Sequence, residues 1–161
     1  SLEGKRIWII GMAPLGMRRT LMAKFLFSTA VSMGVTMALV GASCAMLSIP
    51  PGRVLYFTLT IGVMAFTLNA LAVGLGAVYP NFREDNPSKI VSGFGGTLCL
   101  VLSFLYIVGM LSLMAATSRW AFGGSSTVLF WLGWAVFLGG SFLLGWLPLR
   151  AGIRKMASVE I

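Results

Sequence analysis

The stretch of sequence that determines the fold covers residues 54–82 and reads VLYFTLTIGVMAFTLNALAVGLGAVYPNF. It contains no charged side chain. It is also longer than the ~20 residues that a helix needs to cross the hydrocarbon core of a bilayer. A single strand in lipid would leave its backbone N–H and C=O groups unpaired, whereas a helix pairs them internally. The stretch therefore predicts a transmembrane helix.

Three further runs without charge occupy residues 25–52, 90–118 and 120–149. We therefore expect four transmembrane helices, at about residues 25–48, 54–79, 89–116 and 127–149. The connection IPPGR at residues 49–53 predicts a tight turn, in which the prolines stop the first helix and Gly52 permits the reversal. Helices joined by such short connections run up and down.

The composition supports the same class of protein. Of the 161 residues, 58% are hydrophobic and only 10% are charged, and the mean hydropathy is +0.93. Soluble domains have about 25% charged residues. The chain is therefore predicted to be an all-α integral membrane protein, a bundle of four transmembrane helices with an N-terminal amphipathic cytoplasmic segment. The net charge of +8 does not indicate a nucleic-acid partner, because the basic residues flank apolar runs.

The distribution of the basic residues predicts the topology. In the four-helix arrangement only Arg53 and Arg119 fall on one side. The other side has Lys5, Arg6, Arg18, Arg19, Lys24, Arg83, Lys89, Arg150, Arg154 and Lys155. By the positive-inside rule this second side faces the cytoplasm. We therefore expect a multi-pass protein with a cytoplasmic segment at 1–24, a transmembrane domain at 25–149 and a cytoplasmic tail at 150–161.

The segment 1–24 is too apolar for an ordinary loop and too charged for a membrane span. It is basic, yet it has apolar residues clustered around Trp8. This pattern is typical of an amphipathic element at the membrane surface. It fits a contact with a partner protein, and from the residues alone it fits slightly better an association with anionic lipid, to which each Lys or Arg contributes about 1 kcal/mol. Because the chain opens without Met inside this polar segment, we expect it to be part of a longer protein.

Candidate catalytic groups are lacking. The sequence contains no histidine, and its adjacent acids Glu84 and Asp85 cannot face each other across a substrate. No G-x-x-x-x-G-K-[ST] phosphate-binding motif is present. Cys44 and Cys99 lie in apolar runs, as small packing residues do. We therefore expect no catalytic, cofactor-binding or metal site.

Polar and small residues inside the runs indicate helix packing. Asn69 is the one strongly polar side chain near the middle of a helix, where an interhelical hydrogen bond is favoured over a substrate contact. Small residues four apart allow helices to approach closely. Such pairs are Ala70 with Gly74, Gly41 with Ala45, and Ser141 with Gly145.

Two segments carry a resemblance to a known family. The opening LEGKRIW at residues 2–8 is followed by Ala13-Pro-Leu and then by Lys24-Phe. This pattern resembles the cytoplasmic segment of bacterial permeases of the ABC-2 type transporter family. The segment at residues 79–96 is similar to part of ABC exporter permeases. Gly16 departs from the pattern, because the family often has Ser there and thus a side-chain cap for the helix.

The resemblance implies the transmembrane permease subunit of an ATP-driven exporter in the bacterial inner membrane, of which this chain is the C-terminal portion. ATP would be used by a separate ATP-binding cassette ATPase subunit, so the chain itself would be neither an enzyme nor a cofactor-binding protein. Its other expected partners are membrane lipid and a second permease copy or half. The alternative is a non-transporting membrane scaffold or accessory protein that binds a cytoplasmic partner or anionic lipid.

The resemblance also implies that segment 1–24 couples the ATPase to the membrane helices. The partner-contact residues expected in this coupling segment are Glu3, Gly4, Lys5, Trp8, Pro14, Arg18, Arg19 and Lys24. Those expected in the second cytoplasmic loop are Arg83, Glu84, Asp85 and Lys89.

Overall fold

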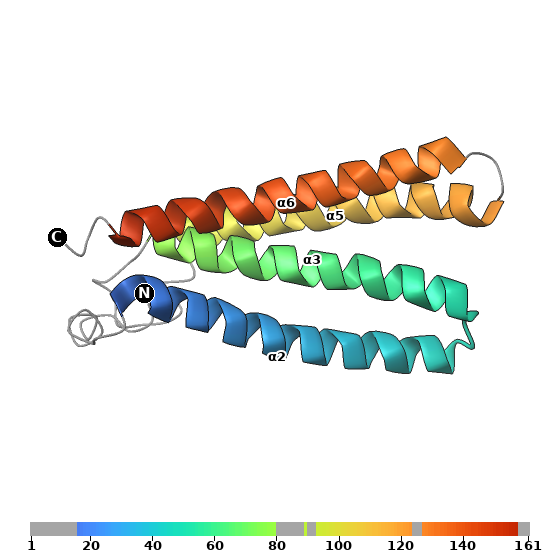
Figure 1. Cartoon of the computed structure of the whole chain (residues 1–161), viewed down its shortest axis with the longest axis horizontal. Helices are drawn as coiled ribbons and strands as arrows, with labels where there is room; N and C mark the ends of the chain where they lie inside the picture. The colour runs from blue at the N-terminus through green and yellow to red at the C-terminus, as the bar shows by residue number, and fades with distance from the viewer. Residues whose placement is uncertain (1–15, 80–88, 90–92, 124–126, 158–161) are drawn as a thin grey trace.

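The computed structural model describes residues 16–79, 89, 93–123 and 127–157. Within these residues the backbone forms four long α-helices and no strand. The helices are α2 (Gly16–Met46), α3 (Pro51–Val78), α5 (Phe94–Gly123) and α6 (Thr127–Ala157), shown in Figure 1. The predicted all-α class with four long apolar helices is thereby confirmed.

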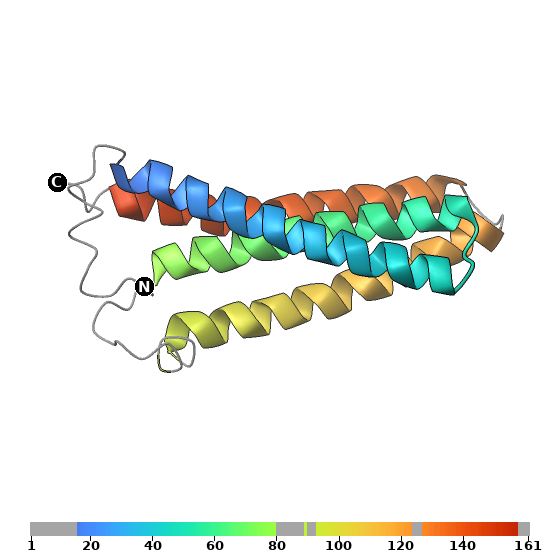
Figure 2. The same cartoon turned by 90° about the horizontal axis from the view of Figure 1, so that it is seen from below.

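The helices run alternately up and down, with α3 and α6 at the centre of the bundle. α3 makes its most extensive contacts with α6, while α2 packs mainly on α3 and α5 mainly on α6. In the described part of the chain α2 and α5 do not contact each other. Figures 1 and 2 show that the start of α2 and the end of α6 lie at the same end of the bundle.

Three helices extend well beyond their predicted limits, and one of them is α5, which continues to Gly123 rather than ending near residue 116. α2 begins at Gly16 rather than near residue 25, and α6 continues to Ala157 rather than ending near residue 149. The added turns contain Arg19 and Lys24 in α2 and Arg154 in α6. Absence of charge marks where a helix can lie in lipid, but Lys and Arg are good helix formers that continue a helix into water. The charge pattern therefore underestimates the helix length.

The turn between α2 and α3 reverses the chain at Ser48. Ser48 has a φ of 49°, in the left-handed region. The Ile49 N–H donates to the Cys44 carbonyl (3.2 Å) and the Ser48 N–H to the Ala45 carbonyl (3.3 Å), which is the hydrogen-bond pattern of a Schellman motif. The prediction that Gly52 permits the reversal is therefore wrong. Gly52 lies inside α3, because Pro51 has the fixed φ that suits the first position of a helix.

The closest backbone contact between helices joins α3 and α6, near the end of the bundle where α3 and α6 end. A Cβ atom built on Gly74 would lie 2.4 Å from the carbonyl carbon of Pro148, and one on Gly152 would lie 2.9 Å from the carbonyl oxygen of Gly74. A Cβ on Gly145 would lie 3.4 Å from the Ala70 Cβ. Only glycine allows the two backbones to approach to this distance. Of the predicted small-residue pairs, Ala70, Gly74 and Gly145 therefore lie in this interface, while Ser141 bonds to Tyr106 of α5.

The predicted pair of Gly41 with Ala45 does not form such a contact. A Cβ atom on Gly41 would meet nothing within 4 Å, so this face of α2 is open in the described structure. Gly95, by contrast, lies against Tyr79, whose Cβ would be 2.8 Å from a Cβ on Gly95. At Gly95 the glycine therefore allows the start of α5 to approach the end of α3.

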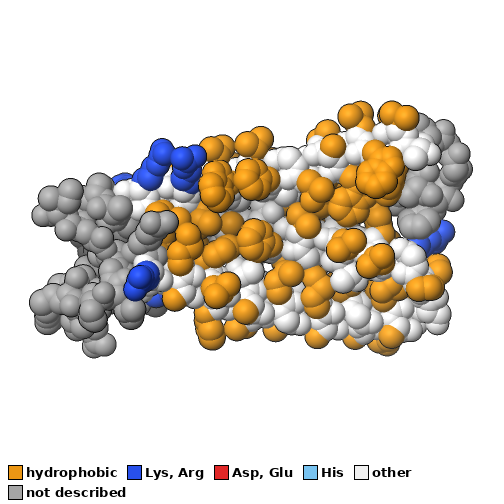
Figure 3. Space-filling view, in the orientation of Figure 1, with side chains coloured by type: hydrophobic (Ala, Val, Ile, Leu, Met, Phe, Trp, Pro, Cys, Tyr) orange, Lys and Arg blue, Asp and Glu red, His pale blue; other side chains and the backbone are white. Residues whose placement is uncertain are grey.

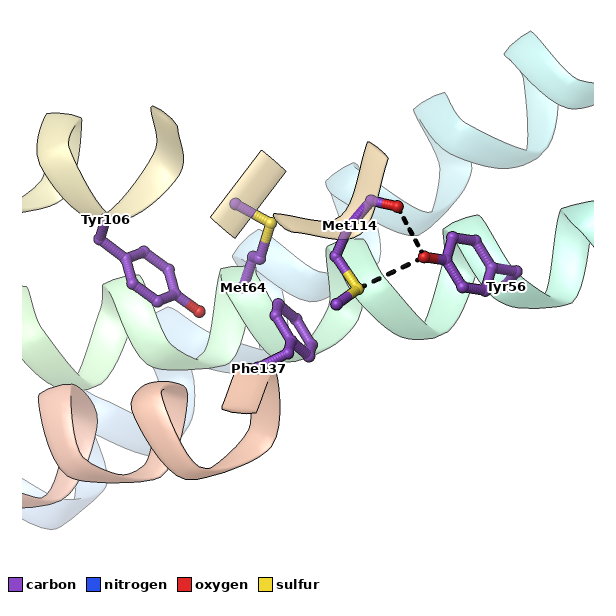
Figure 4. Packing of buried hydrophobic residues seen from close by; sticks show 5 residues of the cluster. All are labelled: Tyr56, Met64, Tyr106, Met114 and Phe137. Carbon is purple, nitrogen blue, oxygen red and sulfur yellow. Dashed lines mark hydrogen bonds between the residues drawn. The ribbon is translucent and has the colours of Figure 1, made fainter. Parts of the chain in front are cut away.

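The main hydrophobic core lies between α3, α5 and α6. Its buried members are Tyr56, Met64, Tyr106, Met114 and Phe137, drawn in Figure 4. The Tyr56 hydroxyl donates to the Met114 carbonyl (2.9 Å) and lies 2.6 Å from the Thr117 Oγ1. Tyr106 forms a second buried hydrogen bond at its hydroxyl, 2.8 Å from the Ser141 Oγ. The phenols therefore bury their rings while their polar atoms are paired.

Asn69 forms the interhelical hydrogen bonds that its position predicts. Its Nδ2 donates to the Ser32 Oγ of α2 (2.6 Å) and to the Ala65 carbonyl of α3 (2.8 Å). Its Oδ1 accepts from the Ser28 Oγ (2.9 Å). The amide thus connects α2 to α3, and the interhelical interpretation is confirmed.

Each helix contains an apolar stretch that is long enough to cross a membrane by its length and composition. The stretches are Arg19–Met46, Pro51–Val78, Phe94–Ser118 and Thr127–Lys155. Large hydrophobic side chains also cover the outside of the bundle, as Figure 3 shows, and Phe27 is 74% exposed. Soluble monomers rarely expose apolar surface on this scale.

The α3–α6 contact leads to a prediction about stability. We expect Gly74→Ala to lower the free energy of unfolding by about 1–3 kcal/mol, because the new methyl group collides with backbone atoms of α6. The measurement is the thermal unfolding midpoint of the purified full chain in detergent. Gly76→Ala is the matched control, because a Cβ there meets nothing within 4 Å. Equal midpoints for the two variants would contradict the proposed role of Gly74.

Candidate functional site at the basic end of the bundle

Basic side chains gather at the end of the bundle where α2 and α5 begin and α3 and α6 end. The described members are Arg19, Lys24, Lys89, Arg150, Arg154 and Lys155. In the described part of the chain Arg53 is the basic side chain at the opposite end. Figure 3 shows Lys and Arg near the two ends of one face, with hydrophobic side chains between them. We call the group of Arg19, Lys24, Lys89, Arg150, Arg154 and Lys155 the basic end.

The structure describes four of the predicted partner-contact residues. Arg19 and Lys24 are exposed on the first turns of α2, and Lys89 is exposed just before α5. The backbone of Arg18 is helical, but its side chain lies outside the described residues. The remaining predicted contacts, which are Glu3, Gly4, Lys5, Trp8, Pro14, Arg83, Glu84 and Asp85, also lie outside them.

Arg19 and Lys24 point in different directions. Five residues separate them, which corresponds to about 140° around a helix. Arg19 shares a face of α2 with Met22, one turn further along. Lys24 precedes Phe25, which is buried against α3 and α6. The two cations therefore cannot both face the same small ligand.

The end of α6 supplies cations that were not among the predicted contacts. Arg150, Arg154 and Lys155 occupy its last two turns. The Lys155 Nζ donates to the Val78 carbonyl at the end of α3 (2.6 Å) and lies 5.8 Å from the centre of the Tyr79 ring. A cation at a helix C-terminus satisfies a free carbonyl and interacts favourably with the helix dipole. Lys155 therefore fixes the end of α3 to the end of α6. A basic last turn in the sequence was the available signal for this contact.

The basic end can bind anions through charge. All four acidic residues of the chain lie outside the described residues. The described residues also contain no cluster of His, Cys, Asp or Glu that could hold a metal ion. What this surface offers is therefore a set of amine and guanidinium donors for phosphate or carboxylate groups.

The fold and this site define an all-helical bundle with an apolar outer surface and one strongly basic end. A family model described as "Putative ATP-binding cassette" matches residues 1–161, the whole length of the sequence. The chain therefore belongs to this ATP-binding cassette family. No curated protein and no solved structure matches the chain.

The family membership corrects the predicted identity and function. The resemblance to permeases of the ABC-2 type transporter family is wrong, because the matching family is one of ATP-binding cassettes and indicates an ATPase-type component. The predicted role as the permease subunit of an exporter is wrong for the same reason, and the alternative of a non-transporting scaffold receives no support from the match. The motifs around Gly4 and Pro14 are short, and a few residues before a long apolar helix do not distinguish related transport families.

The match also corrects the prediction that the chain is not an enzyme. An ATP-binding cassette family is a family of ATPase-type components. The match therefore associates ATP binding with the chain's own family and not only with a partner subunit. Such a family further implies association with other components of an ATP-binding cassette system.

The described residues do not fit a nucleotide. The usual phosphate-binding loop has the sequence G-x-x-x-x-G-K-[ST] and lies between a strand and a helix. That motif does not occur in the sequence, and the described residues include no strand. We therefore derive no step of ATP hydrolysis from them.

The contact of Lys155 leads to a prediction about local stability. We expect Lys155→Met to speed amide hydrogen exchange in the last turn of α3 by roughly two- to fivefold, because a charge at a helix C-terminus contributes about 0.3–1 kcal/mol. Hydrogen-exchange mass spectrometry of the full chain in detergent measures it. Arg154→Met removes the neighbouring charge as a control. Equal exchange in both variants would show that Lys155 has no specific role.

Proposed function

We propose that this chain is the membrane-embedded helical part of an ATP-binding cassette component. The four helices cross the membrane, and the basic end faces the cytoplasm of a bacterial cell. The observation that carries the proposal is the combination of four apolar stretches of membrane length with the whole-chain family match. The excess of Lys and Arg at one end supports the orientation.

The basic end is the surface that we assign to contacts with other components of the system. Arg19, Lys24 and Lys89 are exposed there, and Arg18 lies on the same turns of α2. α2 leads directly from these cations into the bundle, where Asn69 joins it to α3. A contact at the start of α2 is therefore connected mechanically to the centre of the protein.

The membrane topology can be tested by cysteine labelling. In a Cys44→Ala and Cys99→Ala background, Arg53→Cys should react with a membrane-impermeant maleimide in intact spheroplasts. Arg154→Cys should react only after the membrane is opened, because the two residues lie at opposite ends of the bundle. The background without added cysteine is the control, and carbonate extraction checks membrane insertion. Release of the protein by carbonate, or the reverse labelling pattern, would contradict the proposal.

The assigned contact surface has its own test. Arg19→Glu combined with Lys24→Glu should reduce co-purification of other ATP-binding cassette components from native membranes by roughly tenfold or more, because like charges brought together cost several kcal/mol. Arg53→Glu changes the opposite end and should leave recovery unchanged. Equal recovery with all variants would exclude this surface as the contact.

A further inference from the structure

A groove runs along one side of the bundle, in the half next to the basic end. It has a volume of about 540 Å³, within the usual range for ligand sites. Three helices line it. The lining residues used below are Met22 and Phe25 of α2, Phe66 and Thr67 of α3, and Ser141 and Trp146 of α6.

The shape of the groove follows from the close contact of α3 and α6. Its floor consists of small buried residues, including Ala70 and Gly145, where the two helices touch. Two aromatic pairs form its walls. Phe25 and Phe66 pack edge to face with ring centres 5.5 Å apart, and Phe142 and Trp146 stack with ring centres 5.6 Å apart. The groove therefore has small residues along its base and aromatic rings along its sides.

The side chains that line the groove are almost entirely hydrocarbon. Its two hydroxyl groups are already paired, since Thr67 donates to the Val63 carbonyl (2.8 Å) and the Ser141 Oγ lies 2.8 Å from the Tyr106 hydroxyl. The groove also opens outward, because Phe66 is 50% and Phe142 is 63% exposed. Apart from the indole N–H of Trp146, the lining offers a polar solute little to bind, whereas an alkyl chain needs no hydrogen-bond partner.

The length of the groove matches one leaflet of a bilayer. On α6 its lining extends from Leu138 to Leu149, which corresponds to about 16 Å along a helix. Half of the hydrocarbon core is about 15 Å thick.

Two cations stand at the basic end of the groove. Arg19 lies one turn beyond Met22 on the same face of α2, and Arg150 lies one turn beyond Trp146 on the same face of α6. Both are exposed. A charged group attached to an alkyl chain in the groove would therefore lie between a guanidinium from each helix.

We infer that the groove holds one acyl chain of an anionic phospholipid of the cytoplasmic leaflet, with the lipid phosphate on Arg19 and Arg150. The inference rests on the membrane orientation proposed above, because that leaflet is the one at the basic end. Charge complementarity selects the occupant. A second copy of the chain would bring its own cations to this end, whereas an anionic headgroup neutralises them.

The test measures lipid adducts by native mass spectrometry on the delipidated full chain in detergent. Phosphatidylglycerol and phosphatidylcholine with the same acyl chains are supplied at equal concentration. We expect phosphatidylglycerol adducts to exceed phosphatidylcholine adducts by roughly fivefold to thirtyfold, the range for one or two cations near an anionic group. Excess glycerol phosphate, which carries the charge without the chain, should not displace the lipid.

Two pairs of variants distinguish the binding of the acyl chain from the recognition of the headgroup. Leu138→Trp should fill the groove and reduce adducts of both lipids, whereas Leu143→Trp on the outward side of the same helix should not. Arg19→Gln with Arg150→Gln should remove the preference for phosphatidylglycerol. Arg53→Gln with Arg119→Gln removes the same charge on the predicted opposite side and should preserve it.

Several results would overturn the inference. They are equal adducts with both lipids, displacement by glycerol phosphate, a preference that survives the double Arg variant, or no difference between the two Trp variants. Each can occur in a protein that resists carbonate extraction and shows the proposed topology. Failure of the lipid inference is thus distinguishable from failure of the proposed function.

Discussion

The backbone contact between α3 and α6 is the constraint on which the rest of the bundle depends. In the proposed membrane location there is no hydrophobic gain from bringing two helices together, so the helices would associate through close packing and hydrogen bonds. Gly74, Gly145 and Gly152 permit that packing. At the basic end, the hydrogen bond from Lys155 to the Val78 carbonyl joins the ends of the two helices. α2 and α5 then pack on opposite sides of the central pair, each through its own polar contact. Asn69 joins α2 to α3, and Tyr106 joins α5 to α6.

Much of this fold can be predicted from the sequence because a helix is the one conformation in which a long uncharged run pairs its own backbone groups. Four long uncharged runs permit only four helices, and the mid-helix position of Asn69 indicates an interhelical hydrogen bond. The helix ends are less predictable. Charge marks the limit of the apolar layer, whereas α2 and α6 continue through Lys and Arg beyond it. Ser48 is a case of a different kind, since its left-handed conformation is typical of glycine and no local pattern indicates it.

The site is predictable only in part, for a geometric reason. Arg19, Lys24 and Lys89 were expected at the basic end from charge alone, and the structure places them there. The role of Lys155 required knowledge of which helix end lies beside Val78. The groove joins residues around Met22, Phe66 and Trp146, which lie far apart in the sequence. Such a surface arises from the helix arrangement, and no single segment contains it. The family assignment failed where it relied on a few residues near Gly4 and Pro14 instead of the whole chain.

The turn at Ser48 has a mechanical consequence. It is short, and Pro50 and Pro51 follow it directly, so α2 and α3 are held at a fixed separation at that end. The other end of α2 has no such short connection to α3 and lies about 45 Å away along the helix axis. A rotation of only about 5° around the turn would therefore displace the start of α2 by about 4 Å relative to α3. Because the proline turn fixes one end, such a rotation would be largest at the end of α2 that carries Arg19 and one wall of the groove, where the Asn69 hydrogen bonds and the packing of Phe25 oppose it.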